Sequence, residues 1–373
     1  MRLGWGILTM LAAASGASAQ VDPLAPLPVV IPVPEVLIHR APVYTISAPA
    51  SPIRTGFTAY KEQLTARARR EGVREATIQN VVPYLTLNSR VITLDRGQPG
   101  QINNPNSTPP FAPYRRQHVT ADLIRRGRIV YNNHYGQLGQ IGATSGVEPS
   151  IMVSIFGHET SYGTVTGGFD LLDALATLAY EGRRRELFES EFVAAIKLLD
   201  RGTPRYRLKG SWAGATGYPQ FMPSAVLRLA RDGDGDGIAN IWGSQADGFA
   251  SIAQYMKEAG WRPGVPWGIP VRVPYGFDRA AVRSQGVAPR CPRVYQRHSQ
   301  WKSLAEWRAL GVAPVGSTRG LRETEPLSLL EPDGPNTTAY LLSYNYRVIL
   351  DYNCSNFYAL AVGLLADAIA QRG

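Results

Sequence analysis

One stretch, PSIMVSIFGHETSYG from Pro149 to Gly163, limits the folds open to this chain more than any other part of the sequence. Pro149 is suited to a first helical turn, and Ile151, Ile155 and Glu159 follow one another at intervals of four residues. Glu159 therefore continues an apolar stripe instead of facing water. The stretch predicts a core helix whose last turn carries a carboxyl group kept from solvent.

The glycines after this helix decide where the carboxyl group lies on it. Gly163, Gly167 and Gly168 end the helix soon after Glu159, which leaves Glu159 in the last turn. Partial burial and the negative end of the helix dipole both disfavour the ionised form, so both raise its pKa. A raised pKa is what a general acid needs near neutral pH. The alternative is a structural glutamate that bonds to backbone or closes an internal salt bridge.

The pair His158-Glu159 matches the start of a zinc motif, His-Glu-x-x-His, in which two imidazoles on one helix face bind the ion. Tyr162 stands where the second imidazole would have to be. The spacing therefore excludes this type of zinc site. We expect His158 to be a packed or exposed histidine that takes no part in the chemistry.

A second informative stretch, LKGSWAGATGYPQFMPSA at 208–225, combines small residues with aromatic ones. Its glycines and alanines let a ligand approach the backbone closely. Three aromatic side chains supply flat apolar faces, while Ser211 and Gln220 supply hydrogen-bonding groups, and this combination suits a sugar ring. Tight helix packing would explain the glycines equally well. The combination favours a binding groove.

The third stretch, DGDGDGIANIW, has the spacing of a calcium-binding loop. Asp232, Asp234 and Asp236 occupy its positions 1, 3 and 5. The carbonyl group of Ile238 stands at position 7, and Asp247 could supply the carboxylate that position 12 lacks. Three carboxylates this close repel one another without a cation, so we predict a structural calcium ion that braces the fold. The alternative is an empty, solvated turn, and no organic cofactor is predicted.

The start of the chain predicts export. Residues 1–19 have a basic start, a short apolar run and a small-residue end, Ala17-Ser18-Ala19, which together are typical of a cleaved secretory signal. No cysteine lies near the cut, which excludes lipid attachment there, and no later segment is apolar for long enough to cross a bilayer. We therefore expect a soluble, exported protein. Residues 20–54 are rich in proline and predict an extended linker before a folded part that begins near Phe57.

The cysteine count and the net charge narrow the class of protein further. Cys291 and Cys354 form either a disulfide or two buried thiols. The net charge of +10 and the pI of 9.7 suggest a polyanionic partner. Export, scattered basic residues and the lack of a nucleic-acid-binding motif exclude nucleic acid. Anionic cell-wall polymer fits the compartment better, and a basic surface kept for solubility is the alternative.

Helical periodicity runs through most of the chain from Phe57 onward. A loop at 97–113, rich in Gly, Pro and Asn, interrupts it, and short strands and loops are predicted between Trp261 and about Thr338. The predicted fold class is α+β, mainly α, with a small β insertion near the C-terminal end. The predicted helices are 57–82, 118–138, 149–160, 170–181, 185–200, 223–231, 246–259 and a last one through NFYALAVGLLADAIA.

These stretches, in this order, resemble the lytic murein transglycosylase B family of exported bacterial enzymes that cut peptidoglycan. The matching segments are GHETSYG, DLLDALATLAY, RRRELF, KGSWAGATGYPQFMPS, DGDGDGIANIW, IAQYMKEAGW and VILDYNCSNFYALAV. They cover essentially all of 57–370. The resemblance implies a catalytic domain over 55–373. Within it, a lysozyme-like core at about 140–261, with an added helical part, is followed by a small β insertion at about 262–338. A C-terminal helix returns to the body at about 339–373.

The resemblance also implies roles for individual residues. Glu159 matches the single catalytic acid and base of the family. The family's arginine pair falls on Arg183 and Arg184 within the run that ends at Arg185, with the register open by one residue. The Asp-rich loop matches a calcium site that resembles an EF-hand. The residues that match the cleft, where N-acetylmuramic acid and its neighbours are held, are Ser211, Gln220, Tyr255, Tyr352 and Tyr358.

Two departures from the family pattern lie beside these residues. Pro219 stands where glycine is usual, which stiffens the turn before Gln220. Ser161 and Tyr162 replace a common Arg-Trp pair at the rim of the cleft. Neither change touches the acid.

The reaction implied by the resemblance is non-hydrolytic cleavage of the β-1,4 bond between N-acetylmuramic acid and N-acetylglucosamine, which leaves a 1,6-anhydro end. Glu159 would act first as acid and then as base, whereas an ordinary glycosidase uses two carboxyl groups. The alternatives are a muramidase that hydrolyses the bond and a catalytically silent wall-binding scaffold. The implied compartment is the periplasm, the implied substrate is the peptidoglycan glycan strand, and other cell-wall enzymes are candidate partners.

Overall fold

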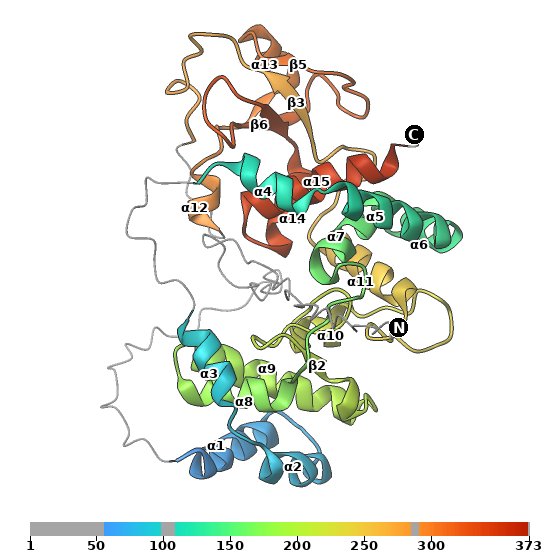
Figure 1. Ribbon diagram of the computed structural model, residues 1–373, viewed down its shortest axis with the longest axis vertical. Coiled ribbons are helices and arrows are strands. Elements are labelled where there is room, and N and C mark those ends of the chain that lie inside the picture. The colour runs from blue at the N-terminus through green and yellow to red at the C-terminus, as the bar shows by residue number, and fades with distance from the viewer. Residues whose placement is uncertain (1–55, 98–108, 285–290, 372–373) are drawn as a thin grey trace, which may run out of the picture.

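The computed structural model describes residues 56–97, 109–284 and 291–371. The predicted signal peptide at 1–19 and the predicted linker at 20–54 lie outside the described residues, as does most of the loop predicted near residue 100. Figure 1 shows α1, α2, α3, α8 and α9 gathered at one end of the molecule, a small sheet at the other end, and α7 between them.

Helix α7, Pro149–Thr160, is buried along most of its length, which confirms the predicted core helix. Every residue from Ile151 to Gly157 is buried, because neighbouring helices cover α7 on several sides. Backbone in the left-handed region begins at Ser161, with φ 51°, two residues before the first glycine. The helices that pack on α7 are α5 (Ala121–Asn133), α6 (Tyr135–Ser145), α11 (Gln245–Glu258) and α15 (Asn356–Ala370).

Gly157 allows a close neighbour on α7. A Cβ atom at this position would lie 2.6 Å from the ring of Tyr162, so a larger residue has no room. The Tyr162 hydroxyl donates to the carbonyl oxygen of Leu123 at 2.9 Å, and the Arg126 guanidinium lies 5.4 Å from the ring centre. Tyr162 is buried and fastens the turn after α7 to α5.

The other helices follow the predicted periodicity with three corrections. The predicted helix 57–82 is broken at Gly72, where φ is +81°. The predicted helix 118–138 is divided at His134, and the loop predicted to reach residue 113 ends earlier, because α4 begins at Phe111. The helices not yet given are α1 (Phe57–Arg70), α2 (Glu75–Val81), η1 (Val82–Tyr84), α3 (Ser89–Arg96), α4 (Phe111–His118), α8 (Leu171–Glu181), α9 (Arg185–Asp200), η2 (Arg205–Arg207), α10 (Pro223–Leu229) and α14 (Tyr344–Tyr352).

A five-stranded antiparallel sheet with strand order β4-β6-β7-β3-β5 forms the β part. It has its own small core around the fully buried Trp307. Strand β7 lies after residue 338 in the chain, yet it pairs with both β3 and β6. The elements are β3 (Gly268–Arg272), α12 (Pro292–Tyr295), β4 (Lys302–Ser303), α13 (Leu304–Ala309), β5 (Ala313–Pro314), β6 (Pro326–Leu330) and β7 (Ala339–Leu342); β1 (Phe169–Asp170) and β2 (Lys209–Gly210) form a separate pair.

A disulfide joins Cys291 to Cys354, with Cα atoms 5.6 Å apart, which decides between the two alternatives for these cysteines. The bond links the β part to the chain between α14 and α15.

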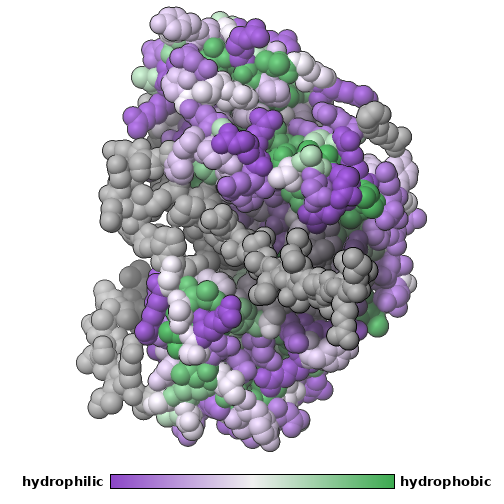
Figure 2. All heavy atoms as spheres, viewed as in Figure 1, coloured by the Kyte–Doolittle hydropathy of each residue, from purple (hydrophilic) through white to green (hydrophobic). Residues whose placement is uncertain are grey.

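Within the described residues no single helix has the length and apolarity needed to cross a membrane; α14 and α15 meet that test only as a pair bent by 115°. The coloured part of the face in Figure 2 is mostly polar, with apolar residues in separate patches.

Candidate active site

Glu159 lies in the last turn of α7, as predicted, beside the turn between α14 and α15. The Tyr358 hydroxyl donates a hydrogen bond to Glu159 Oε1 at 2.6 Å. Burial raises the pKa of Glu159 to about 7, and the Tyr358 hydrogen bond partly opposes that rise. The residue keeps some accessible surface, while its carboxyl group lies among protein atoms that desolvate it. Glu159 can therefore carry a proton near neutral pH.

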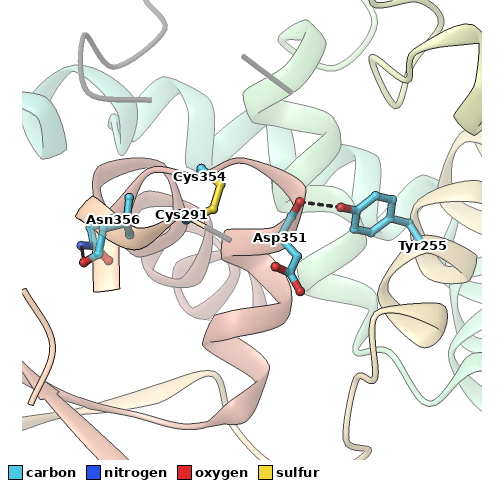
Figure 3. Close-up of a disulfide and its surroundings, with 6 residues drawn as sticks. Tyr255, Cys291, Asp351, Cys354 and Asn356 are labelled. Atoms are coloured by element: carbon cyan, nitrogen blue, oxygen red, sulfur yellow. Dashed lines mark hydrogen bonds between the residues drawn. A yellow bond between two sulfur atoms is a disulfide. The ribbon is translucent and has the colours of Figure 1, made fainter. Parts of the chain in front are cut away.

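A second tyrosine, Tyr352, lies near this carboxyl group and contacts a third, Tyr255. Tyr352, the last residue of α14, donates its hydroxyl to the carbonyl oxygen of Pro219 at 2.5 Å. Its ring centre lies 4.6 Å from that of Tyr255 on α11, and the Tyr255 hydroxyl donates to the Asp351 carbonyl (Figure 3). Burial, with the charge of nearby Glu159, raises the pKa values of Tyr352 and Tyr358 well above their usual value. Both therefore remain neutral hydrogen-bond donors.

The stretch 208–225 packs against the loop that follows α7. Gln220, with φ 52°, donates from Nε2 to the Gly217 carbonyl at 2.9 Å and to the Thr166 carbonyl at 3.3 Å. Gly167 lies so close to this stretch that a Cβ atom there would be 2.2 Å from the backbone of Gly210. Tight packing, the alternative explanation of the glycines, therefore applies at Gly210, and it brings this stretch beside the loop that follows α7.

Ser211 and Gln220 differ in how their polar groups are used. Ser211 Oγ accepts the Ala215 N–H at 3.1 Å. Ser211 and Gln220 are each only partly buried. Gln220 directly follows Pro219, whose carbonyl is bonded to Tyr352. The structure therefore brings Gln220, Tyr352, Tyr358 and Glu159 into one chain of contacts, with Ser211 beside the same loop.

Arg183 and Arg184 are held at a different place. Both side chains pair with the buried carboxylate of Asp95 on α3, at 3.2 and 3.1 Å. The Arg184 guanidinium also lies 4.8 Å from the Phe188 ring centre. Within the described part of the chain no hydrogen bond or ion pair joins either arginine to Glu159. Nothing in the sequence pattern signalled Asp95 as their partner.

His158 is a packed histidine. Its ring centre lies 5.8 Å from that of Tyr358, and burial lowers its pKa to about 4. The residue at the second position of the zinc motif, Tyr162, is turned toward α5. These two residues therefore give no metal site.

The Asp-rich loop gathers carboxylates as a calcium site requires. Asp232, Asp234 and Asp247 offer oxygen atoms that all lie within 4.8 Å of one another. Asp247, fully buried, accepts the backbone N–H groups of Gly233 at 2.8 Å and Asn240 at 2.6 Å. The buried Oδ1 of Asn240 has no hydrogen-bond partner among the described residues. Carboxylate and amide oxygens are the ligands that calcium prefers, so these residues fit the ion.

The other two predicted ligands lie differently. Asp236 is outside this group of three, and its Oδ1 accepts the N–H of Ile238 at 2.7 Å. Ile238 is exposed. The structure therefore gathers three of the predicted ligand residues and leaves the Asp236 carboxylate outside that group.

A cavity of about 380 Å³ lies at the opposite end of α7 from Glu159. Glu148, Trp261 and Asp367 are among its lining residues. Glu148 Oε2 accepts the Trp261 indole N–H at 2.9 Å, and burial raises the Glu148 pKa. This cavity is separate from the carboxyl group and tyrosines described above, because α7 lies between the two.

Comparison with known proteins identifies the family. The model of the transglycosylase SLT domain matches residues 56–367. The chain is 33% identical over 301 residues to membrane-bound lytic murein transglycosylase B of Escherichia coli K12, covering 78% of each chain.

Solved structures of lytic transglycosylases are similar to this chain as well. SltB3 from Pseudomonas aeruginosa in complex with NAG-anhNAM-pentapeptide has a TM-score of 0.73 at 36% identity, over 84% of this chain and 79% of that chain. The Escherichia coli lytic transglycosylase Slt35 in complex with calcium has a TM-score of 0.66 at 28% identity, over 83% and 92% of the two chains. The mainly helical, lysozyme-like fold with a small sheet is shared with them. The chain therefore belongs to the transglycosylase SLT domain family and is a peptidoglycan lytic transglycosylase.

Proposed function

We propose that this enzyme cleaves the β-1,4 bond between N-acetylmuramic acid and N-acetylglucosamine without water and closes a 1,6-anhydro ring. Glu159 serves as the acid and then as the base. The proposal depends on the state of Glu159: burial raises its pKa to about 7, and the Tyr358 hydroxyl, a neutral donor, is bonded to its carboxyl group. A group with that pKa exchanges a proton in either direction near neutral pH.

The reaction needs one carboxyl group because the same group donates a proton in the first step and accepts one in the second. Protonated Glu159 donates to the glycosidic oxygen, and the C1–O4 bond breaks with its electron pair leaving on the oxygen. The N-acetyl carbonyl of the same sugar covers the positive charge at C1. Ionised Glu159 then removes the proton from the C6 hydroxyl, O6 bonds to C1, and the acid form is restored. The Tyr358 hydroxyl supports the carboxylate between the two steps.

We propose that the surrounding residues hold the glycan strand. The chain of contacts that includes the acid also includes Tyr352, Tyr255 and Gln220. Aromatic faces beside amide groups suit sugar rings. Ser211 borders the same loop. Arg183 and Arg184 would contribute positive charge farther along the strand, steadied by Asp95.

We also propose a structural calcium ion, with Asp232, Asp234, Asp236, Ile238 and Asp247 as its ligand residues. Three of their carboxylates are already gathered, and calcium accompanies a relative of the same fold. Bound there, the ion would neutralise the carboxylates that repel one another and would brace the start of α11.

The periplasm is the proposed location, with the catalytic domain over 55–373 and a cleaved signal before it. The basic start and the small-residue end of 1–19 support this proposal.

The mass of the product tests the reaction directly. Digestion of purified peptidoglycan should release fragments whose muramic acid ends lack the mass of one water relative to hydrolysis products. Fragments that carry this water would make the enzyme a muramidase and would remove the anhydro step.

A pair of variants tests the role of the carboxyl group. Glu159→Gln should lose digestion by a factor of about 10² to 10⁴ while it still sediments with peptidoglycan. Glu148→Gln is the matched control, because Glu148 is a second carboxyl group with a raised pKa at the other end of α7. Digestion by Glu159→Gln at the parent rate would refute the assignment. A parent protein that binds but never digests would be a scaffold.

A further inference from the structure

The turn between α14 and α15 makes most of the contacts that fix the site. We call residues 351–358 the tyrosine turn. Tyr358 donates to Glu159, Tyr352 donates to the Pro219 carbonyl, and the Asp351 carbonyl accepts from Tyr255. Three hydrogen bonds from hydroxyl groups therefore hold this turn. The turn donates two of them, to α7 and to the stretch before α10, and it accepts the third from α11.

The chain bends by 115° at this turn, and its middle residue is bonded to the β part. Cys354 lies between the residue that ends α14 and the residue that caps α15, and the disulfide ties it to Cys291 (Figure 3). The partner, Cys291, begins a segment at 291–301 that we call the clamp. The bond reaches across 63 residues of sequence.

Two more contacts fasten the tyrosine turn to the clamp. Asn356 donates from Nδ2 to the Val294 carbonyl at 3.1 Å. Its Oδ1 accepts from Nε2 of the buried His298 at 2.8 Å. Burial lowers the pKa of His298 to about 4, so this histidine stays neutral at the pH of the reaction. The contact therefore does not change with pH near neutrality.

An arginine of α14 is held by the same segment. The Arg347 guanidinium lies 4.4 Å from the ring centre of Tyr295 and 4.6 Å from that of Trp301. Its Nε is buried without a hydrogen-bond partner among the described residues. Two aromatic faces therefore hold this cation, an arrangement that is favourable when the charge is desolvated.

We propose that the clamp positions the catalytic acid: by fixing the tyrosine turn, it holds the Tyr358 hydroxyl on Glu159 and sets the orientation of the carboxyl group. Cys291, Cys354 and Arg347 are then positioning residues of the reaction. The physical reason is that a displacement of about 1 Å in a reacting group can cost about 10²-fold in rate. A disulfide that acted on the unfolded chain alone would change stability and leave the rate unchanged. The proposal rests on the proposed role of Glu159.

The test compares the rate and its pH dependence in three variants. Cys291→Ala with Cys354→Ala removes the bond, and Arg347→Met removes the cation between the rings while keeping much of the apolar stem. Leu327→Ala is the control, because Leu327 belongs to the separate core of the β part and its loss lowers stability without touching the clamp. Digestion is measured from pH 5 to pH 9 at a temperature at which every variant is folded.

We expect the double cysteine variant to lose about ten-fold in kcat, with the alkaline limb of its pH profile moved to higher pH. The titratable groups that face Glu159 in the described part of the chain are Tyr358 and Tyr352, and the Tyr358 hydrogen bond lowers the Glu159 pKa. A loosened bond therefore raises that pKa. Arg347→Met should change both quantities in the same direction by a smaller amount, and Leu327→Ala should change neither.

Unchanged kcat and an unchanged alkaline limb in the folded double variant would overturn the proposal. If the double variant does not fold, Arg347→Met decides: a parent-like rate and profile would overturn it. The result is separable from the proposed function. Inactive Glu159→Gln with unaffected clamp variants would refute the clamp alone, whereas active Glu159→Gln would refute the role of the acid.

Discussion

The end of α7 and the Asp-rich loop place carboxyl groups in opposite surroundings. Glu159 is desolvated and receives one hydroxyl, and its pKa rises to about 7. Asp232 is exposed and accepts the backbone N–H groups of Gly235 and Gly237, and these hydrogen bonds lower its pKa. The first surroundings favour a protonated acid and the second an ionised metal ligand. The donors around a carboxyl group decide between proton transfer and ion binding.

Asp247 is also buried, but the hydrogen-bond donors around it differ from the donor at Glu159. It is fully buried, more so than Glu159, yet its two oxygens accept backbone N–H groups from Gly233 and Asn240. Both N–H groups are fixed by the loop. The carboxyl group of Asp247 is therefore held by the backbone, whereas that of Glu159 accepts a single side-chain hydroxyl.

The largest expected effect follows from this contrast. Asp247→Asn should lower the free energy of unfolding by about 2–4 kcal/mol in calcium. The reason is that a buried backbone N–H loses its acceptor and the calcium ion loses a carboxylate ligand. Thermal melts of parent and variant, with calcium and with chelator, measure it. The parent should melt at lower temperature in chelator, and the variant should respond much less. A melting temperature of the parent that does not change in chelator would count against a bound calcium ion.

A smaller effect is expected at the acid. Tyr358→Phe removes the hydroxyl that lowers the Glu159 pKa, so the alkaline limb of the digestion profile should move upward by up to about one pH unit. Tyr352→Phe is the matched variant, since its hydroxyl bonds to the Pro219 carbonyl instead. If the alkaline limb lies at the same pH in the two variants, the Tyr358 hydrogen bond has no influence on the pKa of the acid.

The smallest effect concerns a support of the loop. Ser244 Oγ accepts the N–H of Asp247 as the N-cap of α11, and it donates to Asp234 at 2.6 Å. Ser244→Ala should cost about 1 kcal/mol of stability and weaken the response to calcium. Urea unfolding with and without calcium gives both quantities. A variant as stable as the parent would show that the aspartates need no such support.

The local parts of this comparison could be predicted from the sequence. Pro149 and the four-residue spacing predicted the core helix, the glycines that follow predicted Glu159 in its last turn, and the structure agrees with both. The Asp-x-Asp-x-Asp pattern predicted Asp232 and Asp234, which the structure brings together with Asp247, whereas Asp236 lies outside the group. Both features depend on residues close in sequence, where helical and loop geometry fix the spacing.

The distant contacts carried no such signal. Tyr358 reaches Glu159 across 199 residues, and Asp95 pairs with Arg183 and Arg184 on another helix. For the same reason the sequence does not show whether Cys291 and Cys354 are in contact. These contacts depend on how whole helices pack, and a spacing rule within one helix contains no information about that.

The pH dependence of stability reports the protonation of Glu159 in the folded protein. Glu159 has a pKa of about 7 in the folded protein against 4.5 in the unfolded chain. Below pH 4.5 both states hold the proton. As pH rises toward 7 the unfolded chain releases it first, so the parent loses about 3 kcal/mol of stability that Glu159→Gln, which stays neutral, does not lose.

The measurement is the free energy of unfolding of both proteins in urea at pH 4 and at pH 8, in constant calcium. We expect the variant to gain about 3 kcal/mol over the parent between these two pH values. A difference between the two proteins that is the same at pH 4 and at pH 8 would show that Glu159 titrates normally and would refute its role as the acid.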